Sequence, residues 1–284
     1  TRFALINLEG YEKKSLDELS LADRWILSRL QKTIMVITQA LENYEFNVAA
    51  KSIYEFFWNE FCDWYIESAK PRLNSEDRIT TQNVLVKVLD SSLRLLHPFM
   101  PFLAEELWQN LPVATESITI APWPEVENAF IDNSVEKNFE TVMQIVKGIR
   151  NVRAELDMAS KQNVVLYILG KSLSKEEELL ICHLANIQRV EYVDKKPINS
   201  ATAFVNEALH VYVDITGVDL HKEISRIEKN IEKLLSEREW YTKKLSDEKF
   251  MSHALEDVIE ETRQKLFQTE SRLKTLQRIL GDLK

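Results

Sequence analysis

Six aromatic side chains lie close together in residues 53–70, where they could stack on flat ligands such as unpaired nucleotide bases. They are Phe56, Phe57, Trp58, Phe61, Trp64 and Tyr65. Rings on a helix that is apolar on most sides usually pack in a protein core. We therefore interpret Trp58, Trp64 and Tyr65 as core residues. Base stacking, which contributes about 1–3 kcal/mol per base, is the alternative.

Two further aromatic residues, Tyr44 and Phe46, belong to a turn that precedes this aromatic helix. Single-stranded RNA is recognised mainly through splayed bases that stack on aromatic side chains. A turn at the end of a helical bundle could present its rings in this way. Tyr44 and Phe46 are therefore the preferred stacking candidates, with packing inside the turn as an equal alternative.

Two basic residues, Lys70 and Arg72, flank Pro71 at the predicted C-terminal end of the aromatic helix. A cation there could bind a phosphate group. It could equally complement the negative end of the helix dipole. Both interpretations stay open for this pair.

Three more basic residues, Lys147, Arg150 and Arg153, share one face of a later predicted helix. Three cations on one face of an acidic body favour a strip that faces RNA. The alternative is pairing with Glu155 and nearby acidic residues.

The last 67 residues contain most of the phosphate candidates. Their charges balance, whereas the rest of the chain carries the whole net charge of −9. The alternative for each residue is a solvated flank of a coiled coil, and for Arg238, at a heptad core position, a packing or register role is preferred. The candidates are Lys229, Lys233, Arg238, Lys243, Lys244 and Lys249, followed by Arg263, Lys265 and Arg272.

No constellation of residues for catalysis is present, and we expect no metal site. With only five glycines, neither common nucleotide-phosphate loop can be written. Cys62 and Cys182 have no partner motif, so they are interpreted as reduced core residues. The five histidines lack metal-ligand spacing. No apolar run approaches the ~18 residues of a membrane span, and the N-terminus has no signal-peptide pattern. We expect a cytoplasmic protein.

The elements that must position these side chains are mainly helices, because glycine and proline are scarce. Ser20 and Asp23 have the spacing of a capping box, which opens the first long helix. Polar residues at spacings of three and four place a single polar stripe on the aromatic helix. Four antiparallel helices with short turns make a bundle. The predicted helices cover residues 20–42, 46–70, 76–96 and 101–111.

Beyond the bundle, an irregular crossing at 112–131 leads to a helix that ends near Leu156. Strand-like runs and a short helix then predict a small α/β unit. The strands are expected at 163–169, 189–193 and 209–215, and the helix at 174–185.

Two heptad-patterned segments after Asp219, one including Leu255 as a core residue, predict an antiparallel coiled-coil hairpin joined by a turn at 246–253. Each helix would be about 39 Å long. We expect this arm to be mobile until something holds it. The predicted domains are 1–127 for the bundle, 128–217 for the α/β unit and 218–284 for the arm.

Three segments resemble the anticodon-binding domain of class I aminoacyl-tRNA synthetases of the valine, isoleucine and leucine group. They are LADRWILSRL (21–30), FFWNEFCDWYIESAKPRL (56–73) and LRLLHPFMPFLAEELWQNLP (93–112). Later segments resemble the valyl-tRNA synthetases in particular: IRNVRAEL (149–156), KLSDEKF (244–250) and DVIEETRQKL (257–266). Asp247, Leu255 and Thr262 depart from the usual family residues, which leaves the shape of the arm's turn open.

The resemblance implies a C-terminal fragment of such a synthetase that binds tRNA-Val. The bundle would receive the anticodon stem and loop, and the arm would lie along the tRNA body. Upstream domains, absent here, would use ATP with magnesium to attach valine, and an editing domain would hydrolyse Thr-tRNA. The fragment would begin partway through the first helix of its domain.

The two catalytic signatures of class I synthetases are absent, so we expect no catalytic residue or cofactor here and no activity alone. Asp157–Lys161 superficially resembles one of them and is interpreted as coincidence. We expect a monomer.

Two alternatives stay open. One is the equivalent region of an isoleucine or leucine synthetase, against which the terminal hairpin argues. The other is a non-enzymatic coiled-coil module for protein interaction.

Overall fold

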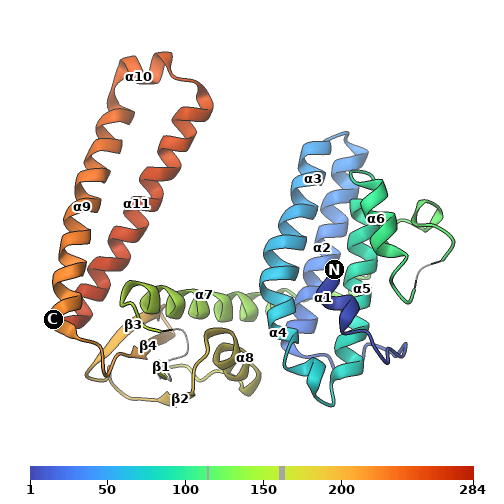
Figure 1. Cartoon of the computed structure of the whole chain (residues 1–284), viewed down its shortest axis with the longest axis horizontal. Coiled ribbons are helices and arrows are strands. Elements are labelled where there is room, and N and C mark those ends of the chain that lie inside the picture. Colours follow the sequence, from blue (N-terminus) through green and yellow to red (C-terminus); the bar gives the residue numbers. More distant parts are fainter. Residues whose placement is uncertain (114, 160–163) are drawn as a thin grey trace. The chain divides into compact units, whose positions relative to one another are not determined.

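The computed structural model describes residues 1–113, 115–159 and 164–284, which divide into two compact units (Figure 1). The units are Thr1–Val142 with Lys175–Leu180, and Met143–Ser174 with Ile181–Lys284. Helix α7 (Asn133–Glu155) begins in the first unit and ends in the second. The three-domain division made from the sequence stays a prediction. None of the helices in the described ranges is long and apolar enough to cross a membrane.

The first unit is the predicted helical bundle (Figure 1). Ser20 opens α2 as expected: its hydroxyl accepts from the Asp23 N–H, and the Asp23 carboxylate accepts from the Ser20 N–H. The helices are α1 (Arg2–Ile6), α2 (Leu21–Glu42), α3 (Phe46–Tyr54), α4 (Glu67–Ala69), α5 (Arg78–Leu96) and α6 (Pro101–Trp108). Short 3₁₀ turns are η2 (Arg72–Asn74), η3 (Ile118–Ile120) and η4 (Asn128–Phe130).

The aromatic helix is continuous, but its middle part, η1 (Glu55–Ile66), is a π-helix. In a π-helix each N–H bonds to the carbonyl five residues back, and long runs of this kind are rare. The sequence did not predict this widening, because a four-residue spacing of polar side chains fits an α-helix as well. The predicted polar stripe is exposed at Glu55, Asn59 and Asp63.

The second unit contains the small α/β part, a four-stranded sheet with strand order β2-β1-β4-β3. Strands β1 and β2 are parallel and flank α8 in the chain, whereas the other pairs are antiparallel. The strands are β1 (Val165–Gly170), β2 (Arg189–Tyr192), β3 (Ser200–Val205) and β4 (Leu209–Asp214), and α8 (Lys175–Ala185) is divided between the two units. The first residue predicted for β1, Asn163, and Ser160–Lys161 of the segment interpreted as coincidence lie outside the described residues.

The sequence analysis missed strand β3. Its small residues Ala201 and Ala203 have low strand propensity, and both are buried. Small residues stand in this strand because α7 packs closely against it. A Cβ atom on Gly148 of α7 would lie 2.1 Å from the carbonyl oxygen of Ala203. Helix α7 therefore lies directly on the backbone of β3, where larger side chains would keep the two apart.

The predicted hairpin is present as α9 (Leu220–Ser246) and α11 (Glu256–Leu283), drawn in orange and red in Figure 1. Its seam buries apolar residues from both helices, as the heptads predict, and also Thr262 and Thr269. The hydroxyls of these two threonines donate to carbonyls one turn earlier in α11. The buried apolar residues include Ile227, Leu234, Leu273, Leu276 and Ile279.

Two details of the predicted hairpin are wrong. The turn contains a short helix, α10 (Glu248–His253), so the second heptad run starts later and Leu255 is exposed. Arg238 is also exposed. Between Leu234 and Tyr241 the half-buried residues are Leu235 and Glu237, and Glu237 fits the same three-and-four spacing.

Candidate functional site

The turn between α2 and α3 presents two aromatic rings to solvent. Tyr44 is 80% exposed and Phe46 is 56% exposed. Tyr44 has a φ of 61°, in the left-handed region, which turns the chain sharply from one helix into the next. The ring centroids lie 6.3 Å apart with planes at 80°, an edge-to-face pair. Both candidates are therefore accessible for stacking.

An apolar groove of about 730 Å³ lies beside this turn. Glu45, between the two aromatic residues, belongs to its lining, as does Glu42. Trp123 also lines the groove and is held to α2, because its Nε1 donates to Thr38 Oγ1 at 2.9 Å. Carboxylates at the edge of an apolar groove can accept hydrogen bonds from the amino groups of bases. The lining consists of Ile34, Met35, Val36, Thr38, Gln39, Ala40, Glu42, Glu45, Val48, Trp123, Pro124, Glu125 and Val126.

The interpretation of the aromatic helix as core is confirmed for Trp64 and Tyr65, which are buried, and wrong for Trp58, which is 56% exposed. The ring of Trp58 stacks parallel to that of exposed Tyr54, with centroids 6.4 Å apart. The sequence held a signal for this exposure, because Trp58 stands directly before Asn59 at the edge of the polar stripe.

Arg72 is placed in a buried polar cluster with Asp23 and Tyr65. Its guanidinium binds both oxygens of the Asp23 carboxylate, one of them at 2.9 Å, and the Tyr65 hydroxyl donates to Asp23 at 2.7 Å. The Asp23 side chain is fully buried. Burial opposes the charge on Arg72, yet the Asp23 carboxylate raises its pKa. This placement argues against the phosphate role considered for Arg72.

The pKa of Tyr65 is also raised well above its ordinary value, first by burial and then by the neighbouring Asp23 carboxylate. Its hydroxyl therefore stays protonated and donates its hydrogen bond. Lys70, by contrast, is exposed, with its Nζ 2.6 Å from Glu67 and 5.9 Å from the ring of Phe3. Lys70 stays a phosphate candidate.

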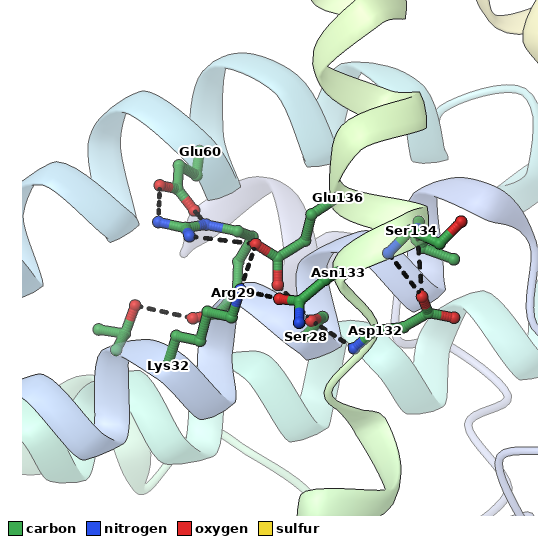
Figure 2. Close-up of polar contacts among 10 residues, drawn as sticks. Ser28, Arg29, Lys32, Glu60, Asp132, Asn133, Ser134 and Glu136 are labelled. Carbon is green, nitrogen blue, oxygen red and sulfur yellow. Dashed lines mark hydrogen bonds and ion pairs between the residues drawn. The ribbon is translucent and has the colours of Figure 1, made fainter.

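A second polar cluster, shown in Figure 2, joins α2, η1 and the first turn of α7. Arg29 donates to both carboxylate oxygens of Glu60 at 2.8 Å. Glu136 accepts from Lys32 at 2.8 Å and from Ser28 at 2.5 Å. Such bidentate, charge-assisted bonds fix geometry as well as charge.

The pKa values in this cluster follow from its contacts. Partial burial opposes ionisation of Glu136, but hydrogen bonds from Lys32 and Ser28 outweigh it and lower its pKa. The hydrogen bond to Glu60 raises the pKa of Arg29. The sequence analysis missed this cluster, since Glu136 lies over a hundred residues from its partners.

On α7, two of the three basic candidates bind backbone carbonyls. Arg150 donates to Leu184 at 2.9 Å, and Arg153 donates to Ala185 at 2.9 Å and Asn186 at 2.8 Å. Arg153 is buried, and burial lowers its pKa. The two arginines thus bind carbonyls at the C-terminal end of α8. Burial argues against an RNA-facing role for Arg153, whereas Arg150 is exposed and stays a candidate. Lys147 is exposed.

On α9 and α10, the basic candidates lie mostly in solvent. Lys244 differs, because its ammonium group lies 4.8 Å from the ring centroid of Trp240 and 4.7 Å from that of Phe250. Lys233 is 4.0 Å from Glu237. The exposed residues are Lys229, Lys233, Arg238, Lys243 and Lys249.

On α11, each basic candidate has an acidic neighbour. Arg263 lies 3.6 Å from Glu260, and Lys265 lies 2.6 Å from Glu261. Exposed pairs of this kind contribute little, so a phosphate group could replace the carboxylate. Arg272 instead lies 3.1 Å from Glu155 at the end of α7.

Within the described ranges, no group of three or more His, Cys, Asp or Glu side chains is arranged to hold a metal ion.

Comparisons with known proteins match both ends of the chain. Residues 23–168 match the family described as the anticodon-binding domain of tRNA ligase, and residues 219–284 match the valyl tRNA synthetase tRNA binding arm.

Curated relatives carry the name valine–tRNA ligase. The protein of Pseudothermotoga lettingae is 62% identical over 282 residues, covering 99% of this chain and 33% of the relative. The protein of Thermotoga maritima is 53% identical over 284 residues, covering 100% of this chain and 33% of the relative. The protein of Bacillus subtilis is 37% identical over 303 residues, covering 100% of this chain and 34% of the relative. The chain spans about a third of the length of these relatives.

Proposed function

The chain belongs to the family of tRNA-ligase anticodon-binding domains and ends in the tRNA-binding arm of the valyl-tRNA synthetases, and we propose that it binds and orients tRNA-Val. The bundle receives the anticodon stem and loop, and the arm lies along the tRNA body. An isoleucine or leucine specificity and a protein-interaction module are not favoured, because the family matches include the valine-type arm.

The observation that carries the proposal is the exposed pair Tyr44 and Phe46 beside an apolar groove. Unpaired anticodon bases stack on these rings, and one splayed base enters the groove. There Glu42, Glu45 and Gln39 are placed to read its hydrogen-bonding edge. Exposed Lys70 contacts the phosphate backbone.

The arm adds backbone contacts that do not depend on sequence. Its exposed lysines bind phosphates and release counterions, so affinity falls with salt. Arg263 and Lys265 exchange their carboxylate neighbours for phosphate oxygens.

The whole protein, of which this chain is a part, is a cytoplasmic, monomeric enzyme that joins valine to tRNA-Val with ATP and magnesium. The glycine spacing excludes a nucleotide-phosphate loop of either common kind from the chain, and the described side chains do not form a metal-ligand cluster. We assign activation of valine and editing to upstream domains of the whole protein. The contribution of this chain is to orient the bound tRNA, so that the acceptor end of the tRNA reaches a distant catalytic site.

The test compares binding of tRNA-Val and tRNA-Ile transcripts to the chain over a salt series, with sedimentation in parallel. The expected result is a monomer that binds tRNA-Val more tightly, with affinity that falls as salt rises. A stable dimer that is indifferent to tRNA would overturn the proposal. Equal affinity for the two transcripts would show that this part of the protein does not distinguish tRNA-Val from tRNA-Ile.

A further inference from the structure

We propose that Glu155, the last residue of α7, is a positioning residue that sets the direction of the arm by holding both of its helices. The inference rests on the proposed function, because it concerns how the arm meets tRNA. Glu155 and Asp282, with the partners described next, are called the root clamp.

Glu155 meets the two arm helices through different groups. Its backbone carbonyl accepts from Arg226 of α9. Its carboxylate oxygens accept from Arg272 of α11, at 3.1 Å from Nε and 3.5 Å from Nη2. The Glu155 side chain is only 18% exposed. One residue of the body therefore touches α9 and α11 at once.

The position of Glu155 at a helix end strengthens the first contact. The last carbonyls of a helix have no partner inside it, and they form the negative end of its dipole. A guanidinium group supplies both a donor and a positive charge there. Arg226 is oriented for this role by Glu223, whose carboxylate lies 2.5 Å away and is almost fully buried.

Asp282, near the end of α11, forms the second part of the root clamp. Its carboxylate accepts from the backbone N–H of Thr202 at 2.5 Å and pairs with Lys196, and it is 11% exposed. Thr202 belongs to β3, one of the two edge strands of the sheet, where N–H groups need partners from outside the ladder. The end of α11 is thus fastened to the sheet.

The root clamp matters because the arm is long. Helix α9 has 27 residues, which corresponds to about 40 Å, so a swing of ~10° at the root moves the tip by ~7 Å. An ion pair needs its atoms within about 4 Å. The hairpin itself is held by its apolar seam. At the root α11 also packs on β3, and the polar contacts add to this packing in fixing where the tip points, and with it the phosphate contacts of Lys243 and Lys249.

The test uses Glu155→Ala and Asp282→Ala, each in the full chain. Both remove a negative charge from a chain of net charge −9, so electrostatics alone would strengthen RNA binding. Glu155→Ala removes the carboxylate that binds Arg272 and keeps the carbonyl that binds Arg226, whereas Asp282→Ala removes the contacts with Thr202 and Lys196. Loss of either set of contacts predicts the opposite, tRNA binding weakened about ten-fold, because an arm of variable direction has a lower effective concentration at the tRNA body. The matched control is Glu191→Ala on β2, which breaks an exposed 2.7 Å pair with Arg189.

Arm direction is read separately, from spin labels at Lys171→Cys in the body and Ser252→Cys at the tip, with Cys62 and Cys182 replaced by alanine. The distance distribution should broaden in Glu155→Ala and Asp282→Ala and stay narrow in Glu191→Ala. Glu155→Gln and Asp282→Asn keep an acceptor oxygen and should restore part of both the narrow distribution and the affinity. If an alanine variant fails to fold, these milder variants still test whether the root clamp sets the direction of the arm.

The outcomes separate the two proposals. If the unmodified chain does not bind tRNA, the proposed function fails. If it binds and the clamp variants match Glu191→Ala in affinity, the positioning role of Glu155 is wrong, whether or not the distance distribution has broadened.

Discussion

The guanidinium of Arg72 and the carboxylate of Asp23 form an ion pair inside the bundle, which joins the start of α2 to the segment after the aromatic helix. The Asp23 side chain is fully buried, and it also accepts from Tyr65 and caps α2. A residue for which the sequence left a phosphate role open is therefore a structural partner of a carboxylate 49 positions earlier.

Arg72→Met should destabilise the bundle by about 3–5 kcal/mol, because it leaves the buried Asp23 carboxylate without its cation. Urea unfolding measures the change. Lys70→Met is the matched control, since Lys70 is exposed and its ion pair with nearby Glu67 is exposed as well, and it should change stability little. A variant Arg72→Met that keeps its stability but loses tRNA affinity would restore the phosphate role.

Glu136 predicts a pH dependence of stability. Burial alone would raise the pKa of the Glu136 carboxyl, but hydrogen bonds from Lys32 and Ser28 lower this pKa in the folded state. Its contribution is present above the unfolded pKa and is lost as pH falls through the lower folded pKa. The stability lost in Glu136→Gln should therefore be largest near neutral pH and should shrink as the pH falls below about 4. Denaturant unfolding at pH values from neutral to below about 4 measures this loss of stability. Glu106→Gln, at an exposed position, is the control. A cost that stays constant with pH would contradict the assignment.

Tyr44→Ala and Phe46→Ala should each weaken tRNA binding without unfolding the bundle, because both rings are exposed. Loss of one stacked base costs about 1–3 kcal/mol, which is about 5- to 150-fold in affinity. Trp58→Ala, which removes another exposed ring, is the comparison. If it costs as much while Tyr44→Ala costs nothing, the bases lie along α3 and η1 and not at the turn.

Gly148→Ala should destabilise the second unit by about 1–3 kcal/mol or more, since the new methyl group would meet the Ala203 carbonyl oxygen. Gly281→Ala is the matched control within the same unit. It lies in α11 with nothing within 4 Å of the added carbon, so it should stabilise by up to about 1 kcal/mol. Thermal unfolding compares them. Equal effects of the two substitutions would mean that α7 does not lie on the backbone of β3.

The sequence by itself determined what depends on local pattern. The capping box of Ser20 and Asp23 predicted the start of α2, and the heptads after Asp219 predicted the hairpin, because spacing alone decides which side chains share a helix face. The family was indicated separately, by segments that resemble the synthetases, and the comparisons confirm it.

Only the tertiary structure decided where individual cations lie. Arg72 and Arg153 looked like surface residues, but both are largely buried and bind a carboxylate and a carbonyl more than thirty residues away. Periodicity reports the face of a helix and not what covers it. Strand β3 escaped prediction for the same reason, because its alanines suit the contact with Gly148 better than they suit an isolated strand.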